Sequence, residues 1–154
     1  MLDDNLNLTR KETKKHIQNV EKYIDCIIED LTERAVNHDS SKLEKYELNG
    51  FSEYTPKLKH SEYGSEEYKS FLKDLQPILE HHYENNDHHP EHFENGIMDM
   101  NLMQITEMLC DWKAATLRHK NGNIYSSIEY NQDRFDYSNE FKQILINTCR
   151  SLGW

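Results

Sequence analysis

Apolar residues recur at helical spacing along most of the chain. The first stretch follows Thr9–Glu12, whose Thr-x-x-Glu pattern predicts a capping box at the start of a helix. Its apolar side is formed by Ile17, Val20, Ile24, Ile27, Ile28 and Leu31. A second capping pattern, at Asp30–Glu33, predicts a new, short helix that ends near residue 37.

A second helical stretch lies in the middle of the chain. Ser65 is a candidate N-cap for it, and its apolar stripe runs through Leu75 and Leu79 to His82. The preceding residues 43–64 contain Asn-Gly, Thr-Pro and Tyr-Gly pairs, which are typical of turns. We therefore predict a long irregular connection there.

Three further helices are predicted in the C-terminal part of the chain. After a loop over residues 85–96, Asp99 or Asn101 begins the helix with the clearest apolar face. A shorter helix follows Ser126, and the last one begins at Ser138. No stretch of useful length alternates apolar and polar residues with a period of two, so the predicted fold class is all-α.

The composition fits one compact helical domain. A chain of 154 residues is long enough for one sizeable core, and we expect a single domain over residues 1–154. Hydrophobic residues make up 36% and charged residues 30%, so the core must be compact and the surface strongly solvated. The 3 prolines and 5 glycines are few for a β-rich fold with its frequent turns.

The charge and the apolar runs exclude several classes of partner. The formal net charge is -10, without the basic footprint that nucleic-acid polymers or anionic membranes require. No apolar run is long enough for a membrane span, and no N-terminal apolar segment indicates secretion. Cys26, Cys110 and Cys149 lack CxxC spacing, and we expect the first two to be buried free thiols. These features favour a cytoplasmic protein.

Histidine is the residue type that points to chemistry. Nine histidines occur, and most of them lie either beside Asp39 or within the short segment from His81 to His92. Neutral imidazole is the commonest metal ligand, and carboxylates complete sites for harder divalent ions. The joint pattern therefore indicates a metal site.

The order of these residues resembles the HD superfamily of metal-dependent phosphohydrolases. His38-Asp39-Ser40-Ser41-Lys42 is similar to the signature that gives the superfamily its name, in which adjacent His and Asp bind metal. His16 stands where the superfamily has an earlier histidine, and Asp111 stands in the apolar helical context of its final aspartate. The resemblance implies an HD-like helical bundle with a metal held by His16, His38, Asp39 and Asp111.

The additional histidines resemble those of branches of the superfamily that hold more than one metal. His81-His82-Tyr83-Glu84 is similar to the HHE element of the HD-GYP branch, although His88-His89-Pro90 stands where that branch has Gly-Tyr-Pro. The resemblance implies a second ion held by His81 or His82 together with His88 or His89. The HDxSK…HHPEHF…DWKAA pattern also resembles a small phage and bacterial family without an established reaction.

The assignment of His16 depends on a reversal of the chain. In one unbroken helix, His16 and His38 would be separated by about 33 Å, which is too far for two ligands of one ion. The predicted site therefore requires a break near residues 27–31, where only the Asp30 capping pattern supports one.

Charged residues near these ligands are candidates for catalytic roles. Glu107 and Arg118 are spaced to share a helical face with Asp111. That face is either a solvated stripe, or a site in which Glu107 acts as a general base or supports a ligand and Arg118 binds phosphate. Lys42 follows the HD pair closely enough to reach a metal-bound phosphate, and Arg134 is a more distant candidate.

The expected activity is hydrolysis of a small phosphate ester, with a nucleotide as one candidate, by one or two divalent ions (Mn, Mg, Fe, Co or Zn). The metal would activate water, while Lys42 and Arg118 would stabilise the developing charge. Two alternatives stay open. One is a di-iron oxygenase on the same HD scaffold, and the other is a non-enzymatic phage factor that binds a partner in the host cytoplasm.

Overall fold

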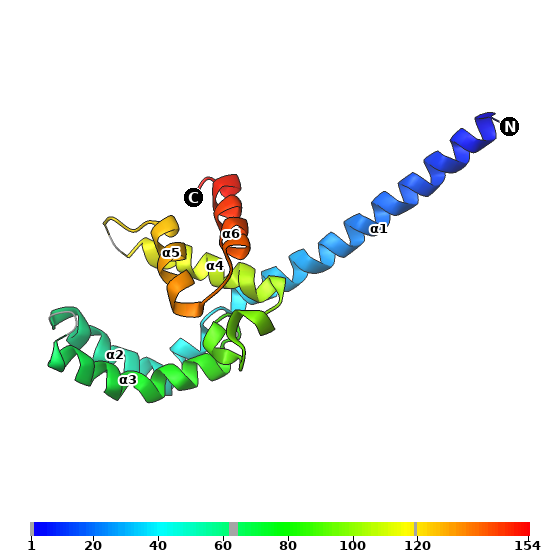
Figure 1. Cartoon of the computed structure of the whole chain (residues 1–154). Helices are drawn as coiled ribbons and strands as arrows, with labels where there is room; N and C mark the ends of the chain where they lie inside the picture. The colour runs from blue at the N-terminus through cyan, green and yellow to red at the C-terminus, as the bar shows by residue number, and fades with distance from the viewer. Residues whose placement is uncertain (1, 62–64, 119) are drawn as a thin grey trace. The chain divides into compact units, whose positions relative to one another are not determined.

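The computed structural model describes residues 2–61, 65–118 and 120–154, and within these ranges it contains helices and loops but no β-strand (Figure 1). The all-α fold class is confirmed. The contacts divide the chain into two compact units, residues 1–37 and 38–154. The expectation of a single domain over residues 1–154 stays a prediction. Within the same ranges, no helix has the length and apolar character that crossing a membrane requires.

The first unit is one helix, α1 (Leu2–Asn37). It begins before the predicted capping box and continues without interruption through residues 27–31, so the predicted reversal is wrong. No glycine or proline interrupts this stretch. Asp30 does not cap a new helix, because its carboxylate accepts a hydrogen bond from the Arg34 side chain one turn later, at 2.8 Å. Cys26 is exposed on this helix, contrary to prediction.

The second unit begins with a short 3-10 helix, η1 (Ser40–Leu43). It is followed by α2 (Lys45–His60) and α3 (Glu66–Asn85), which pack against each other. Helix α2 occupies most of the region predicted to be irregular, of which residues 62–64 lie outside the described ranges. Gly50 lies inside α2 rather than in a turn. Because it has no side chain, α2 can approach Ile78 of α3 closely at this position. The helix predicted from Ser65 is confirmed as α3.

A loop with two 3-10 helices, η2 (Pro90–His92) and η3 (Gly96–Asp99), leads to α4 (Leu102–Thr116). Helices α5 (Ile124–Phe135) and α6 (Asn139–Leu152) follow. Asn101 and Ser138 cap α4 and α6 as predicted, with a complete capping box at Asn101. Helix α5 begins before the predicted Ser126, because the side chain of Asn123 accepts hydrogen bonds from its first turn.

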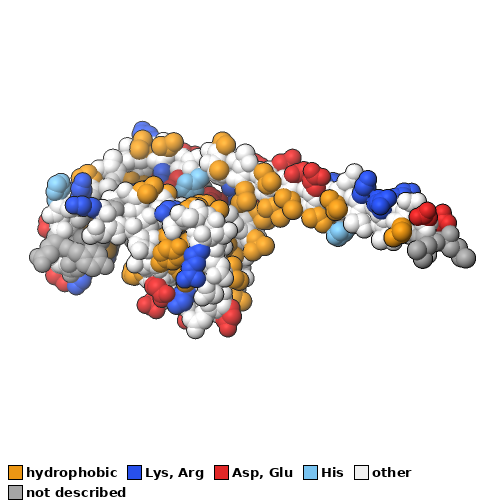
Figure 2. Space-filling view, turned by 90° about the horizontal axis from the view of Figure 1, so that it is seen from above, with side chains coloured by type: hydrophobic (Ala, Val, Ile, Leu, Met, Phe, Trp, Pro, Cys, Tyr) orange, Lys and Arg blue, Asp and Glu red, His pale blue; other side chains and the backbone are white. Residues whose placement is uncertain are grey.

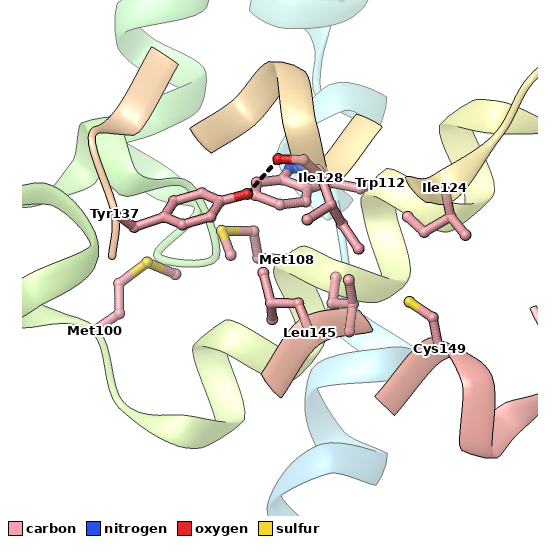
Figure 3. Packing of buried hydrophobic residues seen from close by; sticks show 9 residues of the cluster. Met100, Met108, Trp112, Ile124, Ile128, Tyr137, Leu145 and Cys149 are labelled. Carbon is pink, nitrogen blue, oxygen red and sulfur yellow. Dashed lines mark hydrogen bonds between the residues drawn. The ribbon is translucent and has the colours of Figure 1, made fainter. Parts of the chain in front are cut away.

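The hydrophobic core lies between α4, α5 and α6 (Figure 3). Met108 and Ile128 are at most 1% exposed, and the buried hydroxyl of Tyr137 donates a hydrogen bond to the Ile128 carbonyl at 2.6 Å. Cys149 is buried in this core, whereas Cys110 is exposed on α4, contrary to prediction. This packing fixes the position of α4, the helix that carries Glu107 and Asp111.

Candidate metal centre

Histidine and carboxylate side chains from distant parts of the second unit converge around Asp39. They come from the residues before η1, from α3, from the loop after α3 and from α4. We call Asp39, His82, His88 and His89 the triple-histidine group. We call His38, Asp39 and Asp111 the His38 group. Asp39 belongs to both groups, and the described residues contain a third possible set, His38, His88 and Glu107.

The triple-histidine group has the spacing of ligands around one ion. Asp39 Oδ1 lies 3.3 Å from His82 Nε2 and 3.6 Å from His88 Nε2. His82 Nε2 lies 2.9 Å from His89 Nε2. Bonds of about 2.1 Å to a divalent ion place adjacent donor atoms about 3.0–3.5 Å apart in tetrahedral or octahedral geometry. The donor set therefore fits a divalent ion without a large rearrangement.

Two buried atoms of this group have no hydrogen-bond partner among the described residues. They are Asp39 Oδ1 and His88 Nε2, which face each other. A buried polar atom without a partner costs about 1–3 kcal/mol, so proteins rarely leave one unsatisfied. An ion bound between these two atoms would satisfy both, which is the strongest structural argument for metal at this position.

Two carboxylates contact the Nδ1 side of the His82 and His88 rings. Glu47 Oε2 lies 2.9 Å from His82 Nδ1, and Glu107 Oε1 lies 3.1 Å from His88 Nδ1. An ionised carboxylate can only accept a hydrogen bond, so Nδ1 of each ring carries the hydrogen. When such a ring is neutral, its lone pair is then on Nε2, which points toward Asp39. Metal-binding histidines are commonly oriented by carboxylates in this way.

The backbone of Asp39 has a left-handed conformation, with φ 55° and ψ 19°. Aspartate tolerates this region better than most residues, but it persists only where the surroundings hold it. The two carboxylate oxygens of Asp39 face different groups. Oδ1 faces His82 and His88, whereas Oδ2 lies 3.5 Å from His38 Nε2 and 2.6 Å from Lys42 Nζ. Lys42 thus occupies part of the space that an ion in the His38 group would need.

The pKa of the histidine in the His38 group is raised, whereas that of His89 in the triple-histidine group is lowered. Hydrogen bonds to Asp111 and Glu107 raise the pKa of His38 to about 10, so without an ion this ring carries a proton. Burial, together with the nearby rings of His88 and His82, lowers the pKa of His89 to about 3. His89 is therefore neutral at physiological pH, the form in which imidazole binds metal. The neutral ring of His89 could therefore bind an ion directly, whereas an ion bound to His38 would have to displace the proton of that ring.

The aspartates of the site stay ionised in spite of their burial. Burial opposes ionisation of Asp39, but contacts with His82 and Lys42 hold its pKa well below the usual range. Burial alone would raise the pKa of Asp111. The hydrogen bond with His38 outweighs this effect, so the pKa of Asp111 is lowered overall. This concentration of negative charge favours a cation.

Most of the predicted ligands lie together, but three predicted residues do not. His16 is exposed in the middle of α1, about 32 Å along the helix axis from Asn37, so it cannot share an ion with His38 of the same chain. His81 is 37% exposed, and its Nδ1 lies 2.8 Å from Glu47 Oε1 rather than in either group. Arg118 is exposed beyond the end of α4 at Thr116, so the face of Glu107 and Asp111 does not continue to it.

The other predicted site residues are placed at or beside the centre. They are His38, Asp39, Lys42, His82, His88, His89, Glu107 and Asp111. Both members of the pair His88 and His89 contribute to the triple-histidine group, and of the pair His81 and His82 only the latter does. Glu107 contacts Nδ1 of His38 and of His88, at 2.8 and 3.1 Å, which matches the supporting role considered for it.

Sequence reasoning did not identify Glu47, although its side chain is completely buried and contacts His81 and His82. It lies in the region predicted to be irregular, where no helical pattern drew attention to it. Ser41 also donates to Glu47, at 3.0 Å, and receives a hydrogen bond from Asn86, at 2.7 Å. Ser41 lies inside the HDSSK motif, so the motif was a signal for this part of the network.

The described residues of the second unit thus form an all-α structure with a histidine–carboxylate cluster that could hold a metal ion. The chain belongs to DUF5662, a family of unknown function whose model matches residues 6–151. No curated protein and no solved structure matches the chain.

Proposed function

We propose that this protein is a metal-dependent hydrolase that acts on a small phosphate ester and holds its principal ion in the triple-histidine group. The observation that carries the proposal is the set of donor atoms at coordination spacing, two of which are buried and otherwise unsatisfied. The resemblance of His38–Lys42 to the HD signature gives the class of reaction. The divalent ion would come from the group Mn, Mg, Fe, Co or Zn.

The residues beside the ion fit the needs of phosphate ester hydrolysis. A bound divalent ion would lower the pKa of a water molecule and neutralise phosphoryl oxygens. Lys42 is 33% exposed, so its ammonium can turn from Asp39 toward a phosphate. Asp111 is 22% exposed, so its carboxylate is accessible at the edge of the site.

A cavity of about 300 Å³ lies directly beside the triple-histidine group and has the size of a small-molecule site. His89 and Asp111 form part of its wall, together with Tyr83, Asn131 and Arg134. Arg134 forms an ion pair with Glu91, and its guanidinium can bind an anionic group of a substrate instead. Arg134 therefore takes the place that sequence reasoning gave to Arg118.

The test combines metal content with phosphate release. The purified full chain should contain a divalent ion by elemental analysis and should release phosphate from p-nitrophenyl phosphate or a nucleotide in the presence of Mn²⁺. His82→Ala and Asp39→Asn should lose both the ion and the activity. His60→Ala is the matched control, because His60 is exposed at the end of α2 and belongs to none of the ligand groups. Full metal content in His82→Ala would contradict the proposal.

One observation also supports a di-iron oxygenase as a second candidate. Asp39 directs its two oxygens toward different ligand groups, as a carboxylate shared by two ions would. Two iron ions per chain, with consumption of oxygen and without phosphate release, would favour this alternative over hydrolysis. Metal-free protein with no activity in either assay would favour the non-enzymatic alternative.

A further inference from the structure

Helix α1 carries an apolar side that nothing in its own unit covers. Ile17, Ile24 and Ile28 are 57%, 51% and 54% exposed, although isoleucine is among the residues most often buried. Figure 2 shows hydrophobic side chains gathered along this helix. Helices in water gain most of their stability by packing an apolar face against another element. This side of α1 is therefore a candidate interaction surface.

The spacing of the apolar residues identifies the kind of element that fits. Three- and four-residue steps alternate along the row formed by Ile17, Val20, Ile24, Ile27 and Leu31. This is the a/d pattern of a coiled coil, in which the seam faces another helix. A continuous helix such as α1 can present the whole row to one partner helix.

The charges on α1 indicate that this partner helix is a second copy. Basic residues gather over residues 10–15 in its N-terminal half: Arg10, Lys11, Lys14 and Lys15, with Glu12 as the one acid in that segment. Acidic residues predominate toward its C-terminal end: Asp25, Glu29, Asp30 and Glu33. Two parallel copies would place like charges side by side, whereas two antiparallel copies place the basic segment of each beside the acidic segment of the other.

One antiparallel register pairs four residues of the apolar row with one another and also brings opposite charges level. Positions a and d face each other in an antiparallel pair, so Ile17 can face Ile27 of the second copy while Val20 faces its Ile24. The centre of this register lies at residue 22. The same register brings Lys14 level with Asp30 of the second copy.

We propose that α1 pairs with α1 of a second copy as an antiparallel coiled coil, which makes the protein a dimer. The pairing is independent of the metal centre, whose ligands all lie in the second unit. A membrane surface is a poorer partner for this helix, because its C-terminal half is acidic and would be repelled by anionic lipids.

Sedimentation of the full chain at micromolar concentration tests the pairing. The wild type should be a dimer, and the double variant Ile24→Gln/Ile27→Gln should be a monomer with unchanged metal content. The control, Lys22→Gln/Cys26→Gln, changes exposed positions outside the a/d row on the same helix and should remain a dimer. A monomeric wild type, or equal masses for the two double variants, would overturn the proposal.

A distance measurement tests the orientation. Spin labels at Asn5→Cys, with Cys26→Ser and Cys110→Ser to remove the exposed thiols, report on the N-terminal ends of the two helices. In the antiparallel register the labelled positions are 34 residues apart along the pair, or about 50 Å. In a parallel pair they would be about 10 Å apart, the distance between packed helix axes. The short distance would overturn the antiparallel arrangement.

Discussion

Replacing Glu47 by glutamine tests whether a buried carboxylate orients the histidine at the centre of the triple-histidine group. The Glu47 side chain is completely buried, and its two oxygens contact different rings. Oε1 lies 2.8 Å from His81 Nδ1, and Oε2 lies 2.9 Å from His82 Nδ1. Ser41 Oγ donates a further hydrogen bond to Oε2, at 3.0 Å.

The size of the effect of Glu47→Gln follows from the number of hydrogen-bond acceptor oxygens on the side chain. Glutamine has the shape of glutamate but only one acceptor oxygen, so its amide NH₂ must face the Nδ1 hydrogen of one ring. Loss of a hydrogen bond to a charged group costs about 1.5–3 kcal/mol, and the free energy of unfolding should fall by that amount. If the ring of His82 turns or changes tautomer, Nε2 no longer presents its lone pair to the ion. Loss of such a supporting contact typically weakens metal binding about 10–100-fold.

Chemical denaturation of metal-free protein and metal titration measure the two effects separately. The control is Glu53→Gln on the same helix, because the side chain of Glu53 is 58% exposed and pairs only with the nearby Lys57 among the contacts of the described residues. That variant should change the free energy of unfolding by less than about 0.5 kcal/mol. If Glu47→Gln binds metal as tightly as the wild type, Glu47 does not orient His82 and the argument from its contacts is wrong.

Three further predictions concern stability. Gly50→Ala should lower the free energy of unfolding by about 1–3 kcal/mol, because the new Cβ would lie 2.5 Å from Ile78 Cγ1. An unchanged denaturation midpoint would mean that α2 and α3 are not so closely packed. Asn101→Ala should cost about 1 kcal/mol through loss of the capping box, visible as a lower Tm. Burial raises the pKa of Tyr137, so the free energy of unfolding should fall as the pH rises above about 10. Tyr137→Phe should weaken that dependence in pH-resolved denaturation, and the raised pKa of Tyr83 should leave a remainder.

The helices with clear local signals could be predicted from the sequence. Asn101 and Ser138 are caps whose side chains accept hydrogen bonds from the first turn, and the structure uses both. The Asn49-Gly50 pair misled because a turn and a close approach of two helices both favour glycine. The second cause is a tertiary contact with Ile78, which no local pattern reveals.

The site could be predicted only as far as motifs extend. His38-Asp39 and the His82, His88 and His89 cluster stand out in the sequence because several potential ligands lie close together. Glu47 has no such neighbours, and its importance arises from the packing of α2 on α3. Arg118 was misplaced because the helix was expected to continue, whereas α4 ends at Thr116.

The position of His16 has a consequence for how this centre is completed. In the HD arrangement, an upstream histidine joins the His-Asp pair and the later aspartate. Here the continuous α1 holds His16 away from His38 and Asp39. His82, His88 and His89 lie instead around Oδ1 of Asp39. The ion is therefore expected on the Oδ1 side of Asp39, and Lys42 on the Oδ2 side. On this reasoning, His16→Ala should keep its full metal content, whereas His88→Ala should lose the ion. Elemental analysis of the two variants compares the contributions of His16 and His88 directly.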